Sequence, residues 1–170
     1  SYFAVVGEEK QFTATGTTVG GSTVDATDTC TWSSSSTAVA TVNNTGIVTA
    51  VGNGSGIATT TIKAKTSTAS TTTNVTISST ALSSLTISPT SATLRIGNTR
   101  QLSLIAKFLD NSSYSVASKV TWSSSDTDIA TVSDGGLVTG VASGTATITA
   151  TAENSDGVIT ETMTITVSSS

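Results

Sequence analysis

The stretch VTWSSSDTDIATVSDGGLVTGVASGTATITAT, from Val120 to Thr151, decides the fold of this chain. Val120 and Trp122 lie two residues apart and therefore share one face of a strand. Gly135-Gly136 interrupts the apolar pattern where a hairpin turn needs positive φ. The last part of the stretch alternates alanine and isoleucine with threonine. This is the pattern of a half-buried strand whose solvent-exposed face carries β-branched side chains. The stretch predicts four short strands separated by turns.

A second copy of this stretch lies 90 residues upstream in the chain. TWSSS at residues 31–35 repeats residues 121–125. Further on the copies slip by four residues and later return to register, and insertions of that size belong in turns. The repeat predicts two domains, residues 1–80 (the first unit) and residues 81–170 (the second unit).

The rest of the chain follows the same pattern. In the second unit, Gln101 to Phe108 alternates apolar and polar residues, and Thr162 to Val167 forms an expected closing strand. Each unit then has about seven short strands with turns every 8–12 residues or so, which is typical of a β-sandwich. No window shows helical periodicity. We therefore expect an all-β chain.

The segment ALSSLTISPT, residues 81–90, has no counterpart in the first unit, because Ser1 aligns with Ser91. It predicts an opening strand, whose apolar residues we expect to cover the sheet that starts at Leu94. The first unit therefore begins partway through its repeat. Either the upstream chain is absent, or another chain supplies the strand by β-augmentation.

Four apolar residues cluster at the start of the first unit, next to this gap: Tyr2, Phe3, Val5 and Val6. An uncovered sheet edge exposes unpaired backbone groups, which natural proteins avoid. We therefore expect this cluster to dock onto a neighbouring domain or chain of a larger assembly and to form its attachment side.

Several short motifs occur in a fixed order along the second unit. They are LRIG at Leu94–Gly97, VTWSSSD at Val120–Asp126, IATV at Ile129–Val132, GLVT at Gly136–Thr139 and GTATI at Gly144–Ile148. This ordered set resembles the bacterial immunoglobulin-like domain, group 2, and the first unit carries nearly all of it. The resemblance implies two tandem immunoglobulin-like β-sandwiches without an inter-sheet disulfide. It implies no shared catalytic site.

The family occurs in bacterial adhesins, other surface proteins, accessory regions of secreted enzymes, and phage tail and capsid proteins. The resemblance therefore implies a non-catalytic spacer or cell-adhesion module of a larger extracellular bacterial surface protein. The alternative is a phage virion decoration or tail module that attaches weakly to cell-surface glycans. We expect an extracellular, cell-surface or virion location.

Composition narrows the remaining classes of function. The chain has a net charge of −4, with −1 on the first unit and −3 on the second, and no basic stripe, so we expect no nucleic-acid partner. No apolar run has the length of a membrane span, so we expect no membrane insertion. The sequence has no histidine and one cysteine, and we expect neither an enzyme nor a cofactor.

The candidate site residues each have a functional and a structural interpretation. Trp32 and Trp122 are carbohydrate platforms or, as we favour, core residues in phase with an apolar neighbour. The lone Cys30 is interpreted as a small buried hydrophobe, with an intermolecular disulfide or a reactive thiol as the alternative.

An acidic turn in the second unit offers three carboxylates, Asp126, Asp128 and Asp134, as weak calcium candidates. We favour a solvated turn, because the spacing is not that of a calcium-binding loop. Glycosylation sequons begin at four asparagines, Asn43, Asn53, Asn74 and Asn111. In a chain in which serine and threonine make up about two-fifths of the residues, such matches arise by chance.

Overall fold

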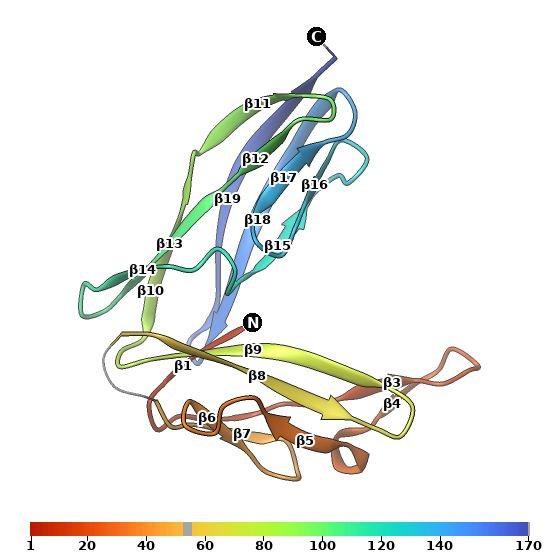
Figure 1. Ribbon diagram of the computed structural model, residues 1–170, viewed down its shortest axis with the longest axis vertical. Helices are drawn as coiled ribbons and strands as arrows, with labels where there is room; N and C mark the ends of the chain where they lie inside the picture. The colour runs from red at the N-terminus through yellow and green to blue at the C-terminus, as the bar shows by residue number, and fades with distance from the viewer. Residues whose placement is uncertain (53–55, 170) are drawn as a thin grey trace. The chain divides into compact units, whose positions relative to one another are not determined.

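The computed structural model describes residues 1–52 and 56–169 and divides them into two compact units, Tyr2–Thr80 and Ala81–Ser170 (Figure 1). Nearly every regular element is a β-strand, and the described residues include one short 3-10 helix, η1 (Thr27–Thr29). Among these residues no helix has the length and apolarity of a membrane span. The expectation of an all-β, sandwich-like chain is confirmed.

The second unit contains ten strands: β10 (Leu82–Ser88), β11 (Ser91–Arg95), β12 (Thr99–Gln101), β13 (Ser103–Phe108), β14 (Ser113–Ser115), β15 (Thr121–Ser124), β16 (Ala130–Val132), β17 (Leu137–Gly140), β18 (Gly144–Asn154) and β19 (Gly157–Ser168). One sheet has the order β11-β19-β18-β15, with β11 parallel to β19. The other strands form β10-β13-β14 and β12-β17-β16.

The hairpin formed by β18 and β19 is the main structural element of the second unit (Figure 1). Its register is unbroken from Gly144, opposite Val167, to Asn154, opposite Gly157. Alanine, isoleucine, methionine and valine point inward and are buried, whereas threonines occupy the alternate positions. A strict period of two therefore places one face of both strands in the core and the other in water.

The core of the second unit is completed by β10 and β13. Leu102, Leu104, Ala106 and Phe108 are each at most 1% exposed, as their alternation predicts. The inward residues of β10 are buried as well: Leu82, Leu85 and Ile87. Apolar side chains from both groups of strands thus bury one another, which is how a sandwich gains its stability.

The first unit contains nine strands: β1 (Tyr2–Val5), β2 (Glu9–Gln11), β3 (Thr15–Thr17), β4 (Thr23–Asp25), β5 (Thr31–Ser34), β6 (Ala40–Val42), β7 (Ile47–Ala50), β8 (Ala58–Lys65) and β9 (Ser70–Ser78). Its main sheet has the order β1-β9-β8-β5, with β1 parallel to β9. The other strands form β2-β7-β6 and the hairpin β3-β4.

Equivalent strands in the two units pair in the same register. Trp32 faces Ala64 across β5 and β8, just as Trp122 faces Ala150 across β15 and β18. The slip in the repeat falls before β8 and at the end of the β18–β19 hairpin. Contrary to the expectation that the insertion lies in a turn, it lengthens the paired strands there, since Ala152 pairs with Ile159 and Asn154 with Gly157. The tight turns use glycine at positive φ, for example Gly46 at 83° and Gly136 at 79°.

Two details go beyond the expectations. The closing strand is longer than Thr162 to Val167, because its first half pairs with the extended end of β18. The opening strand, β10, pairs with β13, with Ile87 opposite Leu104, and it lies next to β19 of the sheet that starts at Leu94. Sequence periodicity predicts which face of a strand is apolar but not which neighbour it pairs with.

Candidate functional site

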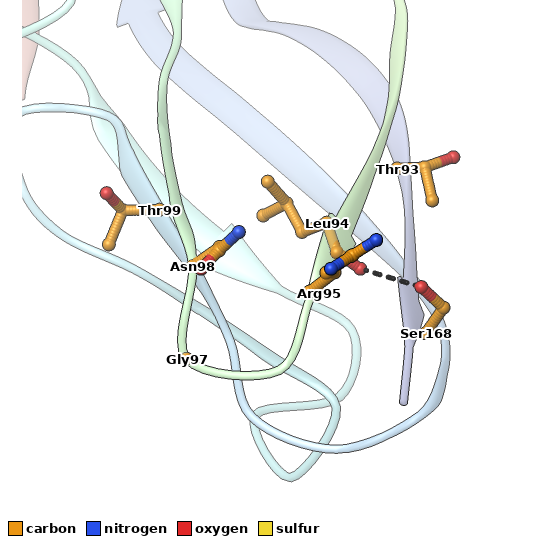
Figure 2. A pocket seen from close by; sticks show the side chains of 7 residues that line it. All are labelled: Thr93, Leu94, Arg95, Gly97, Asn98, Thr99 and Ser168. Carbon is orange, nitrogen blue, oxygen red and sulfur yellow. Dashed lines mark hydrogen bonds between the residues drawn. The ribbon is translucent and has the colours of Figure 1, made fainter. Parts of the chain in front are cut away.

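One hollow of the second unit is shallow and polar, with a volume of about 670 Å³ (Figure 2). It is lined by Thr93, Leu94, Arg95, Gly97, Asn98, Thr99 and Ser168. Gly97 has a φ of 81° in the turn between β11 and β12, and its N–H donates to the carbonyl of Gly140. The hydroxyl of Ser168 donates to the carbonyl of Leu94.

The chemistry of this hollow is limited. Arg95 contributes one cationic group, and Asn98 and the threonines add amides and hydroxyls. A hydroxyl nucleophile needs a nearby base, and the hollow's lining holds no carboxylate, histidine or lysine. The arrangement suits a weak contact with an anionic or hydroxylated group rather than bond making.

The two tryptophans lie with the core. Trp122 is buried, and its indole N–H donates to the carbonyl of Ala117 at 2.7 Å. Trp32 makes the same bond to Thr27, at 2.9 Å, but is only partly buried. The structural interpretation of Trp122 is confirmed. The burial of Trp122 leaves little of its ring surface for a sugar to stack on.

The acidic turn uses its carboxylates locally. An Oδ atom of Asp126 accepts the N–H of Asp128 at 3.0 Å. Within the part of the chain that the structure describes, no three His, Cys, Asp or Glu side chains come together in a way that could hold a metal ion. Asp134 lies in the turn before Gly135-Gly136. The calcium candidates therefore gain no support from the geometry, and the solvated turn stays a prediction.

Cys30 differs from its interpretation as a buried hydrophobe. It is partly exposed and lines a hollow of the first unit, whereas the equivalent Val120 is 7% exposed. Of the sequon asparagines, Asn43 accepts three hydrogen bonds within its turn, from Thr45 and from the backbone of Ile47. The sequon that begins at Asn53 lies outside the described residues.

The N-terminal cluster is built into the first unit. Tyr2 and Phe3 are buried, and the ring of Tyr2 meets that of Phe12 edge-on at 6.0 Å. The hydroxyl of Tyr2 donates to Glu8. Val5 is partly buried, whereas Val6 is 50% exposed. The strand pairs with β9 in the way that β11 pairs with β19, and docking through this cluster stays a prediction.

The outer face of the β18–β19 hairpin carries a regular array that sequence reasoning missed. We call it the threonine face: Thr145, Thr147, Thr149 and Thr151 on β18, opposite Thr166, Thr164, Thr162 and Thr160 on β19. Strand geometry repeats these side chains about every 6.6–6.8 Å along a strand and about 4.7–4.9 Å across strands. The alternation of threonine was visible in the sequence, but the register between the two strands was not.

The corresponding face of the first unit is interrupted. There one threonine pair remains, Thr59 with Thr76. The other cross-strand pairs are Thr61 with Asn74, Lys63 with Thr72, and Lys65 with Ser70. Two lysines thus stand where the second unit has threonines. Long, charged, flexible side chains break the flat order that short β-branched ones create.

Fold and surface together define a β-sandwich module with an ordered hydroxyl-bearing face. The family model of the bacterial Ig-like domain, group 2, matches residues 81–162. The second unit thus matches this family, which confirms the resemblance found in the sequence.

The chain is also similar to Ice-binding protein 1 of Shewanella frigidimarina (strain NCIMB 400). The two are 40% identical over 147 residues, which is 86% of this chain and 16% of that protein. The chain thus spans about one-sixth of this relative's length.

Two solved structures of the S-layer protein SbsC are similar in part. One, of residues 31–844, has a TM-score of 0.44 and 19% identity over 97% of this chain and 28% of its own. The other, of domains 4–9, has a TM-score of 0.45 and 22% identity over 92% of this chain and 25% of its own.

Proposed function

We propose that the chain is a tandem pair of immunoglobulin-like domains, residues 1–80 and 81–170, without an inter-sheet disulfide. It acts as a non-catalytic structural module of a larger extracellular, cell-surface protein. The equal registers of the main sheets in both units support the tandem pair, and the sequence, with its single cysteine, supports the absence of a disulfide.

One observation carries the structural role: the similarity to Ice-binding protein 1 extends over 147 residues yet covers 16% of that protein. A match of this length reaches into both units, because neither unit has so many residues. A sequence similar to most of the pair is therefore part of a much longer protein, as expected for a spacer. The virion alternative receives no support from the comparisons.

Replacement within the larger protein tests the spacer role. In the larger protein, residues 1–170 are exchanged for an unrelated tandem β-sandwich pair of equal length. The display of the larger protein on the cell surface and its binding to its target are then measured. A spacer predicts that both persist, whereas deletion without replacement shortens the protein and weakens binding. Loss of binding with display intact in the exchanged protein would contradict a passive role.

The threonine face favours a second function, adhesion to a surface that is itself ordered. Each threonine presents a methyl group and a hydroxyl, so the array can meet such a lattice with apolar and hydrogen-bonding groups together. Because the relative is an ice-binding protein, ice is the ordered surface that we propose.

Partition of the 170-residue protein into slowly growing ice tests this second function. The variant Thr149→Lys/Thr151→Lys gives the second unit the lysines of the first, and Thr72→Lys, beside Lys63, is the matched control. Adhesion predicts that the double variant stays in the liquid while the control partitions as the unaltered protein does. Equal partition of all three, or binding to a glycan array instead, would contradict it.

A further inference from the structure

The polar hollow at the end of β11 contains a cationic side chain whose charge the surrounding residues do not balance. Arg95 shares the outer face of β11 with Thr93, whereas Leu94 between them points into the core and is 8% exposed. None of the residues that line the hollow is acidic. Within residues 1–52 and 56–169 no carboxylate forms an ion pair with Arg95. The N–H donors of its guanidinium can therefore serve a ligand.

Amide and hydroxyl groups surround this cation. Asn98 lies on one side of Arg95 and Ser168 on the other (Figure 2). The side chains of Thr93, Asn98 and Thr99 form no hydrogen bond within the described part of the chain. One amide and two hydroxyls can thus donate hydrogen bonds to a bound molecule and accept them from it.

Backbone hydrogen bonds hold the turn that carries these side chains. The N–H of Asn98 donates to the carbonyl of Arg95 at 3.0 Å. Gly140 accepts the N–H of Gly97 at 2.8 Å and donates its own N–H to the carbonyl of Asn98 at 3.0 Å. The turn is therefore fixed before a ligand arrives, which lowers the entropic cost of binding.

The first unit shows that the fold does not require these polar side chains. Its turn between β1 and β2 has the same glycine at positive φ, Gly7. The positions of Arg95 and Asn98, however, hold Val5 and Glu8. Glu8 accepts the backbone N–H of Val5 at 3.0 Å and brings a negative charge to this place. The cationic hollow is therefore a property of the second unit and not of the fold.

We propose that this hollow binds a carboxylate-bearing sugar of a polyuronate chain, with Arg95 on the carboxylate. A planar guanidinium donates two parallel hydrogen bonds to a planar carboxylate. Asn98 and the hydroxyls of Thr93 and Thr99 bind the hydroxyl groups of the same or the adjoining sugar ring. The volume of about 670 Å³ lies within the range of small-molecule sites.

The charge and chemistry of the hollow select this class of ligand. A single cation balances the single charge of a carboxylate, whereas a phosphate monoester carries about −1.5 to −2 at neutral pH and needs further donors. Of the lining residues Leu94 alone is aliphatic, and it is buried, so an apolar ligand would gain little. The net charge of −4 repels polyanions in general, so binding of a polyuronate requires a local site.

Titration of the 170-residue protein with trigalacturonate, followed by the NMR shifts of backbone amides, tests the proposal. We expect saturable shifts at residues 95–99 with weak affinity, because an exposed ion pair adds little free energy. The equivalent amides of the first unit, residues 5–9, are the internal reference and should not shift. The methyl ester of the same trisaccharide keeps the hydroxyls without the charge. It should bind at least about tenfold more weakly.

Three substitutions separate the hollow from the overall charge of the second unit. Arg95→Gln removes the cation and should weaken trigalacturonate binding at least about tenfold. Asn98→Glu introduces the residue of the first unit, and its carboxylate should weaken binding by competing for Arg95. The matched control is Arg100→Gln, which removes the same charge from an exposed position of β12 outside the lining. It should leave binding unchanged.

Thermal unfolding of each variant checks that the fold is unchanged. Equal binding of the acid and its ester would overturn the proposal, and so would equal binding of Arg95→Gln and the unaltered protein. Shifts at residues 5–9 as large as those at residues 95–99 would also overturn it. Equal binding of inorganic phosphate would show a plain anion site and would contradict the assignment of a sugar.

Discussion

Trp32 and Trp122 occupy the same place in the two units, and yet one is partly exposed and the other is buried. Both stand on a strand in the same register and donate to a carbonyl five residues earlier. What differs among the described residues is β10, which lies on the neighbouring sheet of the second unit and has no equivalent in residues 1–52 and 56–80. Local sequence thus sets the position of a core residue, and a strand distant in sequence sets how dry it becomes.

The largest effect on the free energy of unfolding is predicted for substitutions of these two tryptophans. Trp122→Ala should cost about 3–5 kcal/mol in the second unit, which approaches the whole stability of a small sandwich. Trp32→Ala should cost less, by roughly 1–2 kcal/mol, because its ring already meets water. Chemical unfolding of the 170-residue protein, followed by circular dichroism, measures both. Equal losses would contradict the difference in cover.

The next largest effect on the free energy of unfolding is predicted for the two turn glycines beneath these rings, Gly46 and Gly136. A Cβ on Gly46 would lie 2.6 Å from the Phe12 carbonyl oxygen and 2.9 Å from the Trp32 ring. On Gly136 the nearest atom, on the Trp122 ring, would be 3.0 Å away. Gly46→Ala should therefore cost about 2–4 kcal/mol, and Gly136→Ala about 1–2 kcal/mol. Thermal unfolding ranks the two, and the reverse order would show that the ring at Trp32 moves aside.

The acidic turn of the second unit has no acidic counterpart in the first, where Ser36, Ala38 and Asn44 stand at these positions. Asp126→Ala should cost on the order of 0.5 kcal/mol or less, the loss of one exposed bond. Melting in Ca²⁺ and in a chelator provides the control, since a ligand of the folded state adds stability. A melting temperature that rises with Ca²⁺, and no longer does so in Asp126→Ala, would establish a metal site.

The smallest effect concerns Asp25 of the first unit. The side chain and backbone N–H of Thr27 lower the pKa of this exposed carboxyl below its ordinary value. A lowered folded-state pKa adds stability at neutral pH, and this is lost as pH falls through that pKa. Asp25→Asn should remove this part of the acid dependence. The second unit, with Ser115 there, should lack it, and urea unfolding at pH 7 and pH 3 checks both.

The strands and their buried faces could be predicted from the sequence, because an apolar pattern with a period of two depends only on neighbouring residues. The alternation of apolar and polar residues was sufficient to predict the burial of Leu102, Leu104, Ala106 and Phe108. Pairing is not local, and the partner of β10 could not be predicted from the sequence for that reason. The threonine face depends on which strands are neighbours, and so it could not be predicted from the sequence.

The central claim is that β10 makes the core of the second unit drier than that of the first, whose described residues contribute no equivalent strand. Calorimetry of the 170-residue protein, with hydrogen exchange to assign each transition, is the most direct test. We predict that the first unit melts below the second, and that attaching ALSSLTISPT ahead of Ser1 raises the first unit's transition and leaves the second unchanged. No shift of the first transition, with the Thr15 and Thr17 amides still exchanging freely, would contradict the account.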